Sequence, residues 1–296
     1  MILFNKFYKL FNIVSVVLIL ISIFLLLFKG LNYGVDFKGG TVIELRSNNS
    51  EITITKLRQS FMKMKLGDVS VKEFGKKTDY LIKFEKKGLN NSNFISEIRK
   101  DLSKFIGNDF EFRRVENVGP KVTAELLKSG MIAIAASLAA MLFYIWIRFE
   151  WQFSLGAIIA LFHDVIITLG IFSLFNLEIN LSIVAAVLTI VGYSMNDTVV
   201  IYDRIRENLS KYNKLEIDQI SNLSVNETLS RTLITSVTTL LALFSIFVLG
   251  GEILKGFSFA MILGVIIGTY SSIYIANPIL VMLKVSQKTI LKEEKE

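Results

Sequence analysis

Residues 12–28 read NIVSVVLILISIFLLLF, an apolar run without a charged side chain. The hydrocarbon core of a bilayer is about 30 Å thick, so a helix that rises about 1.5 Å per residue needs roughly 20 apolar residues to cross it. Because backbone polar groups in lipid must be satisfied within the segment, the run predicts a helix rather than a strand. Lys6 and Lys9 precede it and no small-residue cleavage pattern follows, so we expect an uncleaved signal anchor.

Five further stretches have a similar composition. They are residues 129–147, 153–176, 179–202, 232–250 and 257–283. Within them, the only charged residues or histidines are His163, Asp164 and Asp197. The whole chain is 52% hydrophobic yet carries a net charge of +7, which indicates that apolar and basic residues occupy different stretches. The sequence therefore predicts a multi-pass α-helical membrane protein with six transmembrane helices. The absence of cysteine excludes disulfide-stapled scaffolds and thiolate metal sites.

Lysine and arginine in short connections predict the orientation of such a protein. If the N-terminus is cytoplasmic, the short outer turns contain only Lys255, and the remaining short segments contain the others. Those inner residues are Lys6, Lys9, Arg148, Arg204, Arg206, Lys211, Lys214, Arg231, Lys284, Lys288, Lys292 and Lys295. We therefore expect residues 1–11, 203–231 and 284–296 to be cytoplasmic.

Residues 29–128, between the first two spans, predict a folded domain on the outer side. Alternating strands are expected at 41–46, 69–74, 80–85 and from Phe110 onward. Two amphipathic helices are expected from the spacing of Ile54, Leu57, Phe61 and Met64 and of Phe94, Ile98, Leu102 and Phe105. The order βαββαβ is the ferredoxin-like α+β pattern, with two helices on one face of the sheet. No catalytic constellation accompanies it.

Turn-forming residues flank this domain. Gly39 and Gly40 precede its first strand, and Gly119 and Pro120 follow its last one. These positions are expected to act either as hinges or as plain linkers, and the residues alone do not decide between the two.

Asp197 is the strongest functional candidate, because an acid at membrane depth is costly and by default marks a functional site. It lies about five residues, or roughly 8 Å, before the inner end of its span. An acid there can load and release a proton, and the alternative is an acid that only packs or caps at the interface. Ser224–Glu227 reads as a capping box, so the fifth helix is expected to start at Ser224. Arg231 would then lie at a depth similar to Asp197, although the spacing alone favours an ordinary positive-inside anchor.

Asp164 shares a helix stripe with Gly156, Ala160 and Thr168, which predicts that it points into the bundle. His163 is about 100° further around the helix, so we expect it to point elsewhere and to be a packed, hydrogen-bonded histidine. Small residues also recur in the last span, at Ala260, Gly264, Gly268 and Ser272, which predicts a helix-packing face. Gly192 is a further packing candidate.

Several motifs, in order, resemble the SecF family of protein-export membrane proteins. They are GVDFKGGT at 34–41, VGP at 118–120, RFEW at 148–151, HDVIITLG at 163–170, GYSMND at 192–197, DRIREN at 203–208, RTLITS at 231–236, GG at 250–251 and GFS at 256–258. The resemblance implies half of a transporter of the resistance-nodulation-division type, in a bacterial inner membrane. It implies roles in proton passage for Asp197 and Arg231, which makes Arg231 a favoured partner, and marks Asp164 and His163 as motif members. It also marks Asp36, with the flanking glycines and Pro120, as motif or hinge residues.

The same resemblance implies the partners. These are SecD, the SecYEG channel, YajC as a further candidate and a translocating preprotein, with no nucleic acid and no cofactor beyond the proton as coupling ion. Our hypothesis is that the proton motive force promotes preprotein export during or after SecA-driven translocation. One alternative is a proton-coupled exporter half for small molecules or lipids. Another is an intramembrane aspartyl protease using Asp164 and Asp197, although the G-x-G-D signature of such proteases is absent. We therefore expect that the protein is not an enzyme.

Overall fold

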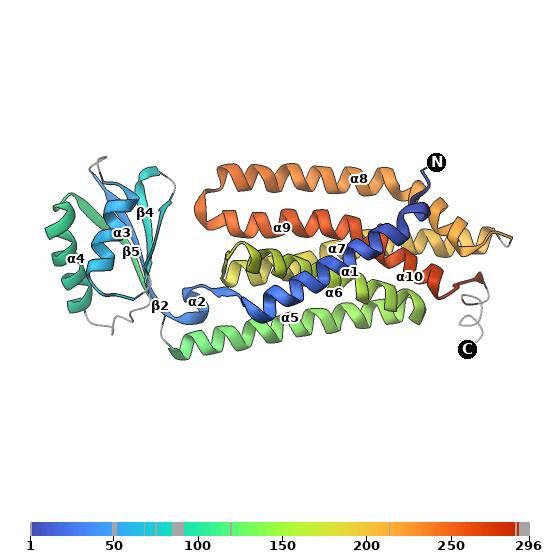
Figure 1. Ribbon diagram of the computed structural model, residues 1–296, viewed down its shortest axis with the longest axis horizontal. Helices are drawn as coiled ribbons and strands as arrows, with labels where there is room; N and C mark the ends of the chain where they lie inside the picture. Colours follow the sequence, from blue (N-terminus) through green and yellow to red (C-terminus); the bar gives the residue numbers. More distant parts are fainter. Residues whose placement is uncertain are drawn as a thin grey trace.

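The computed structural model describes residues 2–48, 52–67, 69–74, 76–84, 92–118, 120–212, 214–287 and 289. It consists of a bundle of long helices with a small α/β domain at one end (Figure 1). Gly119 and most of the 284–296 tail, which the sequence analysis singled out, lie outside the described residues.

Six segments of the described chain are long and apolar enough to cross a membrane, in agreement with the six predicted spans. The first is α1 (Tyr8–Phe28), preceded by the 3-10 turn η1 (Phe4–Phe7). The next four are α5 (Pro120–Arg148), α6 (Trp151–Leu174), α7 (Leu181–Lys211) and α8 (Ile217–Leu249). The sixth combines α9 (Gly251–Ser271), the π-helical turn η2 (Ser272–Ala276) and α10 (Asn277–Met282). The π turn ends two residues before Pro278, which has no backbone N–H to donate and whose ring clashes with the carbonyl four residues earlier.

The helices are buried to different extents within the chain. We compare the share of residues that are buried in the 18-residue apolar stretch of each span. This share is 56% in α6, 50% in α7 and 56% in the last span, against 11% in α1, 6% in α5 and 17% in α8. The first three therefore form the centre of the bundle. The other three leave broad apolar faces available to lipid or to another subunit.

The external domain contains β2 (Gly40–Ser47), α3 (Ile54–Lys63), β3 (Val69–Phe74), β4 (Lys76–Phe84), α4 (Ser92–Ile106) and β5 (Phe110–Val118). Its antiparallel sheet has the order β3-β4-β2-β5, which confirms the ferredoxin-like prediction. Side chains from the sheet (Ile43, Ile82) and from α3 and α4 (Leu57, Phe61, Leu102) are fully buried between the sheet and these helices. The sheet lies between the two helices and the bundle (Figure 1).

An ion pair joins two central strands of this domain. Arg46 donates from Nε and Nη2 to the two carboxylate oxygens of Asp79, each at 2.6 Å. These hydrogen bonds raise the pKa of Arg46, so the guanidinium stays charged. The pair reinforces the β2–β4 register in which Arg46 faces Asp79.

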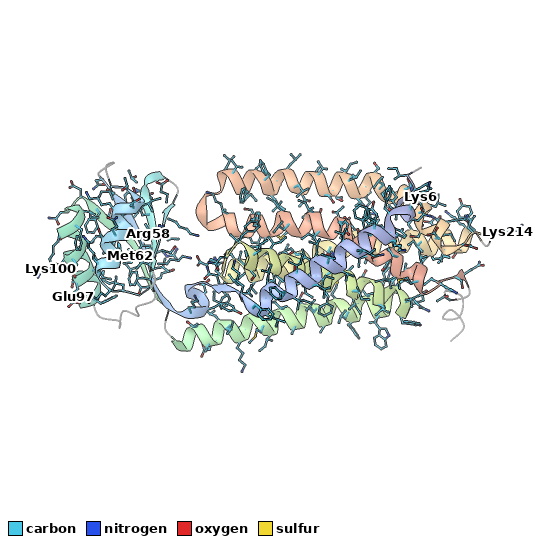
Figure 2. The ribbon with its side chains drawn as sticks, viewed as in Figure 1. Lys6, Arg58, Met62, Glu97, Lys100 and Lys214 are labelled. Carbon is cyan, nitrogen blue, oxygen red and sulfur yellow. The ribbon has the colours of Figure 1, made fainter. Side chains whose placement is uncertain are left out.

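Three short elements connect the domain to the bundle. They are β1 (Asn32–Tyr33), α2 (Val35–Lys38) and β6 (Glu178–Ile179), and β1 pairs in parallel with β6. Lys6 and Lys214 both lie toward the opposite end of the bundle, far from the external domain (Figure 2). These two of the basic residues predicted to be cytoplasmic are thus remote from the external domain.

One predicted helix start is wrong. The fifth span begins at Ile217 rather than at Ser224, and Ser224 lies inside α8, where its Oγ accepts a hydrogen bond from Asn208 Nδ2 at 2.9 Å. The α7 helix also continues to Lys211, so most of the expected 203–231 connection is helical. Side chains between the two helix ends account for the extension, because Glu227 accepts hydrogen bonds from both Arg204 and Asn208.

Candidate functional site

Asp197 lies at the middle of α7 and is only 3% exposed. The Thr269 side chain of α9 lies close to its carboxylate, and Thr269 Oγ1 is 2.7 Å from Ser236 Oγ of α8. The second carboxylate oxygen, Oδ2, has no hydrogen-bond partner among the described residues. A buried acceptor without a partner is costly, and more so when it carries a negative charge. Protonation of Asp197 therefore strongly changes the free energy of its surroundings in the bundle.

Arg231 lies on α8. It is exposed and borders a cavity of about 440 Å³ that opens between α5, α7 and α8. The two side chains, both described, form no direct ion pair, but the guanidinium is near enough to attract the Asp197 carboxylate through space. The two groups therefore interact electrostatically without direct contact, and the role of Arg231 as partner of Asp197 remains a prediction.

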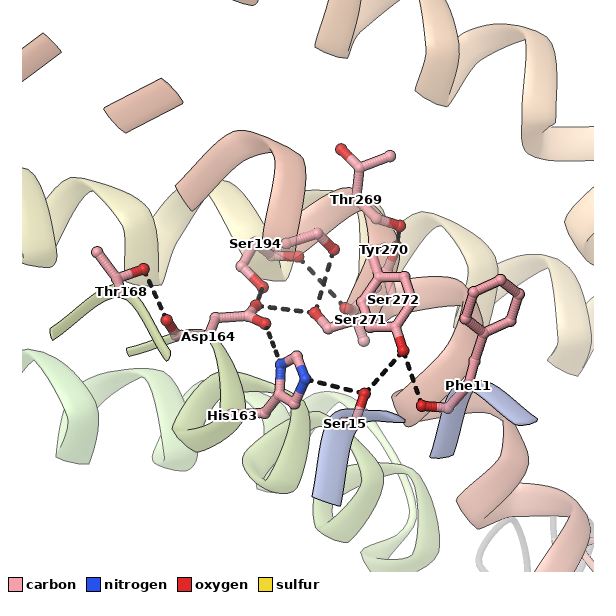
Figure 3. Close-up of polar contacts among 12 residues, drawn as sticks. Phe11, Ser15, His163, Asp164, Thr168, Ser194, Thr269, Tyr270, Ser271 and Ser272 are labelled. Carbon is pink, nitrogen blue, oxygen red and sulfur yellow. Dashed lines mark hydrogen bonds and ion pairs between the residues drawn. The ribbon is translucent and has the colours of Figure 1, made fainter. Parts of the chain in front are cut away.

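Asp164 is completely buried in the centre of the bundle (Figure 3). Its Oδ2 accepts hydrogen bonds from Ser194 Oγ of α7 at 2.5 Å and from Ser271 Oγ of α9 at 2.8 Å. Its Oδ1 lies 2.8 Å from Nδ1 of His163. Gly156, Ala160 and Thr168 on the same stripe are buried as well, which confirms that this face points into the bundle.

The prediction that His163 points elsewhere is wrong. His163 is 1% exposed and bonded to Asp164. Helical spacing describes the direction of Cβ atoms, and the longer imidazole side chain bends back across that angle. The polar chain then continues from His163 Nε2 to Ser15 Oγ (3.2 Å) and from there to the Tyr270 hydroxyl (2.7 Å), which donates to the Phe11 carbonyl. It ties α1, α6, α7 and α9 together (Figure 3).

The glycines of the last span are packing positions, as predicted. A Cβ on Gly264 would lie 2.2 Å from Ile190 Cγ1, and one on Gly268 would lie 3.0 Å from Ser194 Cβ. Gly192 differs from the expectation: it is exposed, a Cβ there would meet no atom within 4 Å, and it borders the cavity beside Arg231. Gly192 lies on the face of α7 that points away from the centre of the bundle, so it has no packing partner in this chain.

Asp36 meets the outer end of α7. Its Oδ2 accepts a hydrogen bond from the Leu181 backbone N–H at 3.0 Å. Gly39 and Gly40 follow with φ of 78° and 141°, a backbone region that favours glycine. The hinge role of these residues remains a prediction.

The inner ends of α5 and α7 meet in a cluster that the sequence analysis did not predict. Arg148 Nη2 lies 2.7 Å from Asp203 Oδ1, and Arg206 Nη2 lies 3.0 Å from Oε1 of the buried Glu150. Both guanidinium groups also lie over the Phe149 ring. The signal was present, since all five residues belong to the RFEW and DRIREN motifs, but nothing in the motifs indicates that they meet.

Comparisons with known proteins decide the family. A model of the C-terminal part of the protein export membrane proteins SecD and SecF matches residues 98–286, and one of the SecD/SecF GG motif matches residues 24–51. The protein translocase subunit SecF of Rickettsia bellii is 47% identical over 94% of this chain and 91% of its own length. That of Cereibacter sphaeroides is 43% identical over 95% and 89%. The chain belongs to the SecF family.

Solved structures agree with this membership. SecDF from Thermus thermophilus, described as a translocon-associated membrane protein, superposes with a TM-score of 0.81 at 32% identity, covering 95% of this chain and 38% of the solved chain. SecDF in a super-membrane-facing form gives 0.72 at 32% identity, with 100% and 40% covered. The chain thus spans about two fifths of the solved SecDF chains and nearly the whole of its SecF relatives.

SecF membership settles the class of function. SecF proteins are protein translocase subunits, so the chain is a transport protein of the export machinery rather than an enzyme. The aspartyl protease and the small-molecule exporter that the sequence left open are not supported. Among the SecF motif residues, Asp164 bonds to His163, and Asp36 of α2 accepts a hydrogen bond from the first residue of α7.

Proposed function

We propose that the chain works with a SecD subunit to promote preprotein movement across the membrane, using protons that are taken up and released at Asp197. The observation that carries this proposal is the buried Asp197 carboxylate, which has an unpartnered Oδ2 and lies near the charge of Arg231. Preproteins emerging from a SecYEG channel, with YajC as an accessory, are the proposed setting.

The energetic argument concerns the charge state of Asp197. A carboxylate in an apolar bundle is costly to keep charged, and protonation removes that cost. Arg231 stays protonated, so it supplies a fixed positive charge rather than a second titrating group. Each elementary charge that crosses the membrane provides about 2.3 kcal/mol per 100 mV. A few protons per cycle can therefore bias a movement whose end states differ by a few kcal/mol.

A second subunit is proposed to complete the site. The cavity beside Arg231 opens on the side of the bundle formed by α5 and α8. Most of the apolar residues of these two helices are not buried by the rest of the chain. The solved relatives are single SecDF chains that are much longer than this one, and half-transporters place their ion sites where two repeats meet. A SecD subunit on this face would enclose Arg231 and Asp197.

The orientation follows from charge. Lys6 and Lys214 lie at the end of the bundle opposite the external domain (Figure 2). By the positive-inside rule this end is cytoplasmic, so both termini are proposed to face the cytoplasm of a bacterial inner membrane. The external domain then faces the outer side, where an exported chain emerges.

Asp164 and His163 are proposed as a secondary proton site. A carboxyl and an imidazole 2.8 Å apart can share one proton, and the chain through Ser15 to Tyr270 offers hydroxyl groups along which a proton can move. Unlike Asp197, however, each Asp164 oxygen already has a hydrogen-bond partner. The main role of Asp164 in this proposal is therefore to hold the helices together, and proton transfer is its secondary role.

The test is export in cells that depend on this chain together with its SecD. Asp197→Asn keeps the size of the side chain and removes its titration, so it should abolish the part of export that depends on the proton motive force. Glu207→Gln is the matched control, because Glu207 is on the same helix but its side chain is 46% exposed, in surface ion pairs with Arg204 and Lys211. Assembly with SecD is verified by co-purification. Normal export by the assembled Asp197→Asn variant would refute the proposal.

A further inference from the structure

We infer that the segment around Asp36 is a mechanical joint that fixes the outer end of α7 to the external domain, with Asp36 as its positioning residue. The outer joint is defined here as residues 29–38 together with residues 173–181. It would transmit movement of the helix that carries Asp197 to the external sheet. This inference rests on the proposed proton role of Asp197.

The first observation is a double cap on α7. The first backbone N–H groups of a helix have no partner within the helix. Here Asn180 Oδ1 accepts from the Ile183 N–H at 3.2 Å, and Asp36 Oδ2, from a segment far away in sequence, accepts from the Leu181 N–H at 3.0 Å. A negative charge at this end also complements the helix dipole. Asp36 thus holds the start of α7 from outside the helix.

The second observation is the number of bonds that tie the two halves of the outer joint. The β1–β6 pairing is extended by the Gly34 N–H, which donates to the Ile179 carbonyl at 2.8 Å. Further bonds run from Ser173 Oγ to the Gly30 carbonyl (2.6 Å), from Lys29 Nζ to the Leu174 carbonyl (2.7 Å) and from Asn32 Nδ2 to the Asn176 carbonyl (3.2 Å). These bonds bind the linker along the whole turn between α6 and α7.

The joint is closely packed at position 34. A Cβ on Gly34 would lie 2.5 Å from Oε1 of Glu178. A larger residue would therefore displace the Glu178 carboxylate, which is the group that pairs with Lys83. The joint is therefore packed as well as hydrogen-bonded, so its two halves are expected to move as one body.

The third observation is that the joint has two connections to the sheet. The linker continues through Gly39 directly into β2, a central strand paired with both β4 and β5. In addition, Lys83 of β4 forms an ion pair with Glu178 of the turn, with Nζ and Oε1 2.5 Å apart and both side chains at most 20% exposed. A cavity of about 690 Å³ separates other parts of the sheet, such as Leu81, from outer helix residues such as Phe172 and Phe259.

A single continuous helix, α7, connects this joint to Asp197. The α7 helix is continuous from Leu181 to Lys211, so Asp197 lies on the same rigid rod about 24 Å from the capped end. A shift of α7 at Asp197 displaces Leu181, and Asp36 and Glu178 carry the displacement to β2 and β4. Coupling over such a distance needs a contiguous, rigid element, which α7 and the joint supply.

The experiment is a series at Asp36 with two readouts, in the full complex with SecD. Asn can still accept the Leu181 N–H, whereas Ala cannot. We expect Asp36→Ala to lose the proton-dependent part of export while keeping assembly, and Asp36→Asn to retain most of it. For the second readout, the chain contains no cysteine, so spin labels can be placed at the exposed positions Lys100→Cys in α4 and Leu254→Cys in α9, with a cysteine-free SecD. The label distance reports the placement of the external domain on the bundle.

The two readouts separate the inference from the function it rests on. We expect Asp36→Ala to broaden the label distance distribution and Asp36→Asn to leave it narrow. Reversing Lys83→Glu alone should also broaden it, and adding Glu178→Lys should restore it. Unchanged distances in Asp36→Ala, or equal defects in Asp36→Asn and Asp36→Ala, would overturn the joint. Normal export by Asp197→Asn would instead overturn the proton role, and the distance measurement would still decide on the joint.

Discussion

Asp164 and His163, adjacent on α6, are joined by a 2.8 Å contact between Oδ1 and Nδ1 at the centre of the bundle. Both side chains are essentially inaccessible, and the pair connects Ser194 and Ser271 on one side to Ser15 on the other. Four helices from distant parts of the chain therefore meet on one polar network. Such a network stabilises a bundle only while all its members are satisfied.

The first prediction is that Asp164→Ala destabilises the protein. It leaves the buried Ser194 hydroxyl without its acceptor and His163 Nδ1 without its partner, at a cost of about 1–3 kcal/mol for each unsatisfied group, whereas Ser271 keeps the Gly268 carbonyl. The thermal midpoint of the purified complex, followed by size exclusion, should fall clearly. Asp101→Asn on the surface of α4 should leave it unchanged. An Asp164→Ala complex as stable as the native one would contradict the structural role.

The second prediction compares two glycines of the bundle. Gly264→Ala forces a methyl group against Ile190 and should cost about 1–3 kcal/mol, as overpacked sites do. Gly192→Ala places the same methyl in open space and should be neutral or stabilising, because alanine favours helix by about 1 kcal/mol. Melting of the two variants side by side checks the difference. Equal effects would show that the α7–α9 contact is looser than described.

The third prediction concerns the inner cluster. The Glu150 side chain is 2% exposed and its partner is Arg206, so Arg206→Ala leaves a buried charge unpaired, at a cost of ~3–5 kcal/mol. Arg148→Ala breaks an exposed pair with Asp203, worth about 0–1 kcal/mol. Both guanidinium groups lie over the same Phe149 ring, so the loss of that contact is matched. If Arg148→Ala were the more harmful change, the assignment of the buried pair would be wrong.

The sequence predicted the features that the bilayer and the sheet impose on side-chain patterns. The run at 12–28 has to form a spanning helix, and Tyr80, Ile82 and Phe84 have to share one face of a strand. The Gly264 and Gly268 spacing likewise predicted close helix contact.

Other features depend on side chains that leave no periodic signal. Ser15 and Ser271 look like ordinary polar residues in apolar helices, and their convergence on His163 and Asp164 comes only from helix packing. The Ser224–Glu227 capping box failed because its side chains bond to Asn208 and Arg204 of α7 instead of closing a helix start. Asp36 was noted as a motif residue, but its bond to Leu181 spans most of the first half of the chain.

The central claim is that Asp197 carries the coupling proton, and proton flux tests it most directly. The complex of this chain with SecD is reconstituted with SecYEG into the membrane of vesicles that enclose a preprotein and a pH-sensitive dye. A membrane potential is then imposed. We predict that the native complex admits protons during translocation and that Asp197→Asn stops this flux, whereas Glu207→Gln does not. Proton entry through the assembled Asp197→Asn complex at the native rate would contradict the account.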